Sequence, residues 1–551
     1  MKNRFFSNLP VIGMLIIVLV GYYFIHNLVY IGESRYTQEN WHNSSTIKFV
    51  NCWLEEGACN LKYLMFENPK SIEYDDIYER NAYISYPSGV VFPPFIAAKL
   101  TGKDEIHAVF VLKFLEYKYL VDVLLFCFLF YSFFSITLNI KKKIPISIAS
   151  ALLSLIWMFL PDNMFWLRNV FFSDQFIITL VLAFTILEIW SPLIENKKAA
   201  IRWIFYSFKF LLSIYGVLTD YYFLFVLFVS WLVKVVPLFK LKEHKYSVIL
   251  KNSAIYVLPV ILGLGLYVWQ ISNDPNCWSK IMWKIEERTM GEIPSGRNLF
   301  LQIIMNFVKS YTAIGALSVS VFLAFLIKNL IYHIKHKVKI EPEYIPFYKI
   351  GIIICVPPIL QVFTFMNHSS IHMFAMIKFG LPFMFSVFAF TYYNVTKYKP
   401  SLGKNGIFVG TILLSSVLIA IVNLIIIYGP FKYYKSYKNE PVEYTLAHTI
   451  RDHYHYEDVY FSFTDSIPDN QPIELAISKK RMYRIDDLSD IYSLFPKLKS
   501  DANKLIVINN DVQNKSDCIR GKEDFIERNG ILLYSKENYA VYNVNNLANT
   551  K

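Results

Sequence analysis

Long apolar runs recur along most of this chain and constrain its fold more than any other feature. The first run, Val11 to Ile31, is long enough as a helix to cross the roughly 30 Å hydrocarbon layer of a membrane. A content of 54% hydrophobic and 18% charged residues is also too apolar for a soluble protein of 551 residues. We therefore expect a polytopic α-helical membrane protein with about eleven transmembrane helices. The ten further spans are predicted at 119–138, 144–160, 171–190, 204–216, 222–236, 254–271, 313–327, 350–365, 373–392 and 407–428.

Lysine and arginine residues predict the orientation of these spans, because cytoplasmic loops carry the positive excess. Clusters such as Lys141 to Lys143 and Lys240 to Lys245 fall in every second loop, which places the amino terminus in the cytoplasm. With an odd number of crossings, the carboxyl terminus lies outside. The formal charge of +12 is then explained by topology and by contact with anionic lipid head groups, and it requires no nucleic acid.

Two regions are predicted. Residues 1–428 form the transmembrane bundle, which includes a large first outer loop at 32–107, and residues 429–551 form an extracytoplasmic α/β domain. In the loop, we expect a helix near 46–54 and a second one at 90–100 that Pro93 and Pro94 break.

The tail alternates short apolar runs with polar segments, which is typical of a small α/β domain. Strands are predicted at 459–461, 505–508, 531–534 and 540–542, with helices near 442–454 and 487–494. No glycine-rich phosphate-binding motif occurs in this region, so a nucleotide-binding role is not expected.

Four of the six cysteines lie on the predicted outer side, which is potentially oxidising. The sequence leaves open whether Cys52 and Cys59 form a disulfide. Their spacing is not a zinc pattern, because no paired Cys-x-x-Cys or adjacent histidine accompanies it.

Charged residues gather at the predicted outer edge of the bundle, where ionisable groups at membrane depth are costly unless they face a cavity or a partner. A glycosyl transfer needs a carboxylate that takes a proton from the acceptor and cations that stabilise the departing phosphate. This edge supplies both kinds of group, although any single pair could instead be an ion pair or an anchor at the membrane edge. The residues are Glu33, Arg35, Arg168, Asp174, Asp220, His368, His372 and Lys378.

Three motifs carry a resemblance to a known family. The first loop opens with Gly32-Glu33-Ser34-Arg35-Tyr36, its later part reads Tyr86-Pro87-Ser88-Gly89-Val90-Val91-Phe92-Pro93-Pro94, and Asp174 lies at the outer end of the fourth span. With the helix layout, these motifs resemble the GT-C class of integral membrane glycosyltransferases. The branch closest in arrangement contains the protein O-mannosyltransferases and the aminoarabinose transferases that modify lipid A.

The resemblance implies an enzyme that transfers a sugar, with inversion, from a polyprenyl-phosphate-linked donor to a glycan, lipid or protein acceptor of the cell envelope. The reaction would take place on the outer face of a bacterial inner membrane. Gly32 replaces the first acid of the family motif, so the base becomes Glu33, or one of Asp75 and Asp76, with Asp174 as a further acid of the site. For such a reaction, we expect the cations Arg35, Arg168 and Lys378 at the outer edge to hold the donor phosphate. Tyr36, Tyr86, His368 and His372 are the expected substrate-binding residues.

No cofactor is assigned from the sequence. Asp75 and Asp76 could alternatively bind a divalent cation, as carboxylates do in metal-dependent relatives, and the metal requirement stays open.

Three other functions are compatible with parts of this pattern. A transporter or flippase for lipid-linked glycans would carry charges near the bilayer midplane. An O-antigen-type polymerase would place its large outer loop late in the bundle. A catalytically inactive relative is compatible with Gly32.

Overall fold

The computed structural model describes most of the chain in the ranges that follow. The described residues are 2–29, 40–74, 77–158, 160, 162–239, 246–289, 298–311, 345–386, 388, 442–453, 455–464, 477–495, 502–510, 517–536 and 538–547. The predicted spans 313–327 and 407–428 lie outside these residues.

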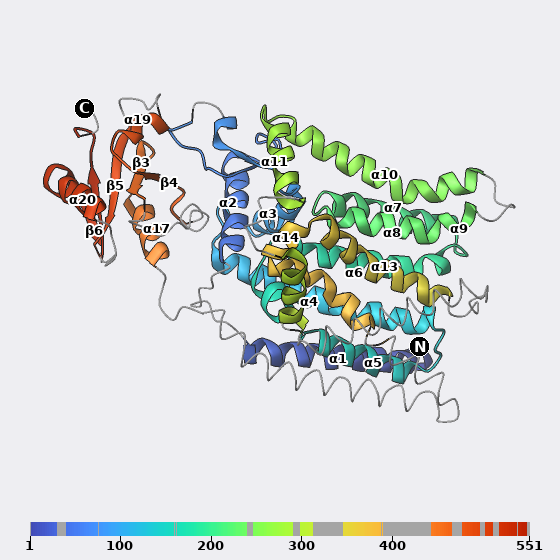
Figure 1. Ribbon diagram of the computed structural model, residues 1–551. Coiled ribbons are helices and arrows are strands. Elements are labelled where there is room, and N and C mark those ends of the chain that lie inside the picture. Colours follow the sequence, from blue (N-terminus) through green and yellow to red (C-terminus); the bar gives the residue numbers. More distant parts are fainter. Residues whose placement is uncertain are drawn as a thin grey trace.

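The core of the molecule is a bundle of apolar helices that lie side by side (Figure 1). Six of the described helical segments are long and apolar enough to cross a membrane: 108–137, 173–194, 199–217, 222–239, 246–271 and 345–364. The predicted spans at 11–31, 144–160 and 373–392 correspond to shorter apolar helices. The bundle helices are α1 (Lys2–Val29), α4 (Ala108–Ser132), α5 (Lys143–Met158), α6 (Ser173–Ile194), α7 (Ala199–Val217), α8 (Tyr222–Lys234), α9 (Val236–Phe239), α10 (Tyr246–Ile271) and α13 (Ile345–Thr364).

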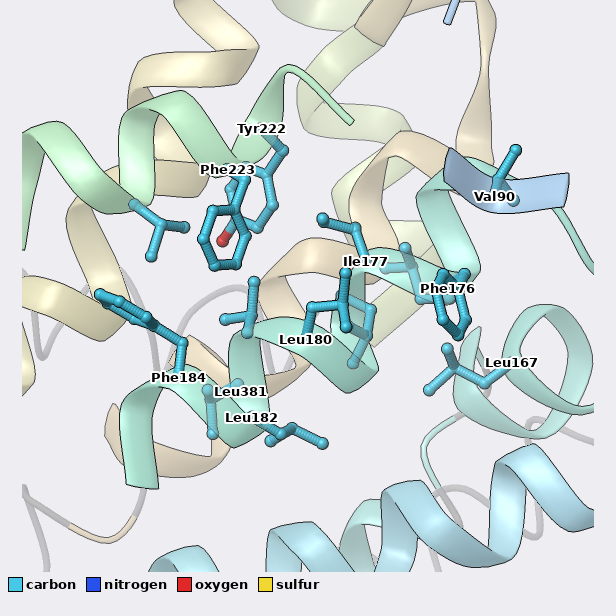
Figure 2. Packing of buried hydrophobic residues seen from close by; sticks show 14 of the residues in the cluster. Val90, Leu167, Phe176, Ile177, Leu180, Leu182, Phe184, Tyr222, Phe223 and Leu381 are labelled. Atoms are coloured by element: carbon cyan, nitrogen blue, oxygen red, sulfur yellow. The ribbon is translucent and has the colours of Figure 1, made fainter. Parts of the chain in front are cut away.

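Helix α6 lies at the centre of this bundle and is buried on most sides. Its apolar side chains pack against α8 and the segment around Leu381, as Figure 2 shows for Ile177, Leu180 and Phe184. Because close-packed interiors permit little displacement, this packing holds the first turn of α6 in a defined position. That turn carries Asp174.

The first outer loop packs against the end of the bundle through helices α2 (Asn40–Glu56) and α3 (Phe92–Leu100) and the short 3₁₀ segments η1 (Ile77–Arg80) and η2 (Ser88–Val91). The helix predicted near 46–54 is confirmed as part of α2. The prediction that Pro93 and Pro94 break a helix is wrong, because α3 begins at Phe92 and the prolines occupy its first turn. Proline is tolerated there, since the first helical N–H groups have no partner within the helix.

Gly89 is the point where this loop touches the bundle most closely. Its N–H donates to the carbonyl oxygen of Leu218 at 2.8 Å, and its own carbonyl accepts the Tyr215 hydroxyl at 2.9 Å. A Cβ atom at this position would lie only 2.3 Å from the Leu218 oxygen. Glycine is therefore required by the close approach of two backbone segments.

Cys52 and Cys59 are both free, so the disulfide left open by the sequence is not formed. Cys52 is buried within α2, where the Arg80 guanidinium donates to its sulfur at 3.8 Å. Cys59 follows the end of that helix and is exposed, with its sulfur 2.9 Å from the Tyr63 hydroxyl. The helix end at Glu56 separates the two side chains.

The carboxyl-terminal segment contains a five-stranded sheet with the order β4-β3-β5-β7-β6. Strands β3, β4 and β5 are parallel, whereas β7 runs antiparallel to β5 and to β6. Strands were correctly predicted at β3, β5, β6 and β7, while β4 and α20 were missed. The elements are α17 (Val442–His453), β3 (Asp458–Phe463), β4 (Met482–Ile485), α19 (Asp490–Leu494), β5 (Asn503–Asn509), α20 (Asp517–Asn529), β6 (Ile531–Lys536) and β7 (Tyr539–Asn543).

The edge strand β4 of this sheet contacts the first outer loop. The hydroxyls of Tyr74 and Tyr483 lie 2.6 Å apart, and the Arg481 guanidinium donates to the Asn68 side-chain oxygen at 3.0 Å. Ile72 packs against the apolar core on one face of the sheet. Burial raises the pKa of the neighbouring Glu73 carboxyl to about 6.

Candidate functional site

Asp174 is the acid around which the site is built. It lies in the first turn of α6, where a carboxylate is favoured by the positive end of the helix dipole. Its Oδ1 atom is 2.6 Å from Lys378 Nζ, and its Oδ2 atom accepts the Tyr86 hydroxyl at 3.1 Å. Both carboxylate oxygens are thus held by donors from segments far apart in the sequence.

Lys378 lies between two carboxylates. It belongs to the 3₁₀ segment η6 (Met373–Phe379), and its Nζ atom is 3.5 Å from Asp220 Oδ2 as well as bonded to Asp174. Asp220 Oδ1 accepts the N–H of Tyr222 at 2.8 Å, as expected for an acid in the turn before α8. Burial raises the pKa of the Asp220 carboxyl although Lys378 opposes the shift. The single ammonium and two carboxylates make a compact polar centre inside an apolar bundle.

A cavity of about 240 Å³ opens beside Asp174. Its walls come from the first loop, the start of α6, and the helices α11 (Cys277–Thr289) and α14 (Met366–Ile371). In Figure 1, α11 runs across the end of the bundle near α14. The lining residues are His42, Tyr83, Ser85, Tyr86, Phe172, Asp174, Lys284, Glu287, Arg288, Asn367, His368, Ile371, His372 and Phe374.

Arg288 is a cation of this cavity without a carboxylate partner among the described residues. Its guanidinium lies over the Tyr86 ring at 4.4 Å from the centroid, and it forms no ion pair with any described residue. By contrast, Lys284 is paired with Glu287 at 2.6 Å. A guanidinium in a partly enclosed site with no paired carboxylate is suited to bind an anionic ligand.

Two histidines complete the wall. His368 Nε2 is 3.3 Å from the Tyr86 hydroxyl, and the rings of His368 and His372 have centroids 4.6 Å apart. Burial lowers the pKa of both imidazoles, that of His368 well below its usual range. Both are therefore neutral at pH 7 and act as hydrogen-bonding groups rather than cations.

The structure brings together six of the predicted residues. Tyr86, Asp174, His368 and His372 line the cavity, and Lys378 joins Asp174 to Asp220. Arg168 is not among the residues that line this cavity, although it lies only six positions before Asp174. It is buried within electrostatic range of Tyr22 and Tyr119. The predicted residues Glu33, Arg35, Tyr36, Asp75 and Asp76 lie outside the described residues.

Sequence reasoning did not single out Arg288. The signal was the spacing of Cys277, Ile281, Lys284 and Arg288, which fall on one face of a helix. Cys277 is buried and Ile281 packs against the core, so this face points into the protein and carries Lys284 and Arg288 to the cavity.

Within the described ranges, no group of three or more His, Cys, Asp or Glu side chains is arranged to hold a metal ion. Asp75 and Asp76, the acids with the alternative metal-binding role, lie outside the described residues.

No family model matches the chain, and no curated protein matches its sequence. Among solved structures, the chain is similar to the crystal structure of ArnT from Cupriavidus metallidurans in the apo state, with 10% sequence identity, a TM-score of 0.48 and 100% of both chains covered. A match at this identity and TM-score does not show that two proteins share an activity, so the proposed function rests on the site residues.

Proposed function

We propose that the protein is a membrane glycosyltransferase that transfers a sugar from a polyprenyl-phosphate-linked donor to a cell-envelope glycan, lipid or protein. The observation that carries this proposal is a buried carboxylate, Asp174, in one cavity with an unpaired guanidinium, Arg288. A proton acceptor and an anion receptor within one pocket are the two groups that such a transfer requires.

The donor phosphate would lie against Arg288, with the Lys378 ammonium strengthening the positive field on the Asp174 side of the cavity. The acceptor hydroxyl oxygen forms a new bond to the anomeric carbon of the sugar, while the bond from that carbon to the phosphate oxygen breaks. The phosphate leaves with the electron pair, and the guanidinium stabilises its added charge. The anomeric centre is inverted because attack and departure occur on opposite faces.

We assign the hydroxyl proton to Asp174, because a base must lie within hydrogen-bond reach of the proton that it abstracts. Tyr86 and Lys378 orient this carboxylate, and the neutral His368 holds the Tyr86 hydroxyl on its other side. Glu33, Asp75 and Asp76 are the alternative bases from the first loop.

Placement in the bacterial inner membrane, with the site at the outer face, is part of the proposal. It is supported by the six apolar helices and by the alternating lysine pattern of the loops. A lipid-linked donor suits this placement, since its chain stays in the bilayer while its sugar phosphate reaches the cavity.

The test is a transfer assay in proteoliposomes, with radiolabelled polyprenyl-phosphate hexoses and pentoses as donors and native membrane extract as the acceptor. We expect Asp174→Asn to abolish transfer and Glu286→Gln, on the exposed side of α11, to leave it unchanged. Full transfer by Asp174→Asn with loss in Glu33→Gln, Asp75→Asn or Asp76→Asn would assign the base to the first loop instead. Movement of donor between leaflets without a new glycosidic bond would contradict the enzyme and favour a flippase.

A further inference from the structure

A second group of charges lies at the opposite end of the bundle from the site. Glu188 of α6 is fully buried and pairs with Lys209 of α7 at 2.6 Å, while Lys234 of α8 lies 3.5 Å from its other oxygen. The Tyr256 hydroxyl of α10 donates to the same carboxylate at 3.0 Å. The cluster thus joins four helices through one carboxylate.

This cluster is far from the candidate functional site. Asp174 and Glu188 are separated by about 21 Å along α6, and Tyr222 and Lys234 by about 18 Å along α8, at a rise of 1.5 Å per residue. Lys234 is at the last turn of α8, the end that the lysine pattern of the loops assigns to the cytoplasm.

The cluster contains more positive than negative charge. The short contact with Lys209 largely neutralises Glu188, so the longer contact leaves the Lys234 ammonium only partly compensated. Lys349 of α13 lies within electrostatic range of Lys234 and forms no ion pair with any residue that the structure describes. Two lysines are therefore left without a full counter-charge on the packed pair α8 and α13.

Lys349 also lies on a surface that faces lipid. Ile345 and Ile352 are 39% and 43% exposed. They stand four positions before Lys349 and three after it, on the same face of α13. Exposed isoleucines on a helix of this length and hydropathy face acyl chains when the bundle lies in a bilayer. A lysine within such a stripe, within electrostatic range of a second lysine on a helix packed against it, offers a phosphate site with apolar surroundings.

We propose that Lys234 and Lys349 bind the phosphate of an anionic phospholipid, whose acyl chains lie along α13. Basic sites between transmembrane helices are the arrangement by which membrane proteins select anionic head groups. The role is independent of the sugar-transfer site, and it concerns a lipid of the bilayer rather than a substrate.

The test is native mass spectrometry of the full-length protein titrated with phosphatidylglycerol, with phosphatidylcholine as the zwitterionic reference of zero net charge. We expect wild type to bind phosphatidylglycerol more tightly than phosphatidylcholine. In the double variant Lys234→Gln/Lys349→Gln, the affinity for phosphatidylglycerol should fall about fivefold for each lysine removed, because each charge near an anionic surface contributes about 1 kcal/mol. The double arginine variant should keep the preference. Lys251→Gln, which removes an exposed lysine of α10, is the matched control and should behave as wild type.

Equal affinity of wild type and the double glutamine variant for phosphatidylglycerol would overturn the proposal. Displacement of the lipid by inorganic phosphate alone would overturn the lipid assignment, because a free anion would then suffice. If the double variant does not fold, Lys349→Gln alone gives the same readout, since this side chain is partly exposed and forms no ion pair among the described residues.

Discussion

Replacing Arg288 by glutamine removes the only cation of the cavity wall that lacks an acid among the described residues. If its guanidinium binds the donor phosphate, the variant loses a charge-assisted hydrogen bond, which contributes about 1.5–3 kcal/mol. At about 1.4 kcal/mol for each factor of ten, kcat/KM for the lipid-linked donor should fall about 10- to 150-fold. The variant breaks no ion pair with a described residue, and a thermal melt of the purified protein checks that it folds as wild type does.

The assay is initial-rate transfer in proteoliposomes at varied donor concentration. Arg288→Lys should lie between wild type and Arg288→Gln, because it keeps the charge but loses the planar fork that matches a phosphate. Lys113→Gln, at an exposed position of α4, makes the same change of charge outside the cavity and should leave kcat/KM unchanged. The assignment of Arg288 is refuted if Arg288→Gln and Lys113→Gln have equal kcat/KM.

Three further predictions concern the first outer loop. Because the Glu73 pKa is raised from 4.5 to about 6, the folded state binds the proton more tightly, and stability should fall as pH rises through this interval. In urea unfolding, Glu73→Gln should remove this pH dependence of the free energy of unfolding. At 1.36 kcal/mol per pKa unit, it should also stabilise the protein at pH 7.5 by about 2 kcal/mol. An unchanged pH dependence would exclude Glu73 as its source. Gly89→Ala should lower the free energy of unfolding by about 1–3 kcal/mol, because the new methyl group meets the Leu218 carbonyl oxygen. It should also reduce transfer, because Gly89 is only three residues from Tyr86. A melting temperature equal to that of wild type would show that the contact can relax. Maleimide should label Cys59 in the native protein without prior reduction, whereas labelling that requires a reductant would indicate a disulfide.

Local sequence patterns were sufficient to predict most of the described helices and strands and part of the candidate site. Apolar runs located the helices because a membrane span must satisfy its own backbone hydrogen bonds within a continuous apolar segment. Asp174, His368 and Lys378 were found for a related reason, since an ionisable residue beside such a run needs a cavity or a partner. Strand β4 was missed because its sequence, Met482 to Ile485, is short and carries an arginine, and its pairing with β3 comes from a distant segment.

The sequence by itself determined a membrane bundle with an acid-bearing outer edge, because hydropathy and charge are properties of each segment alone. Only the tertiary structure decided that Lys378 meets Asp174 across 204 positions, that Arg288 enters the cavity and that Arg168 does not line it. Whether a helical side chain faces a cavity, a neighbouring helix or lipid depends on the rotation of the helix against its neighbours. That rotation is set by packing among segments that lie far apart in the chain.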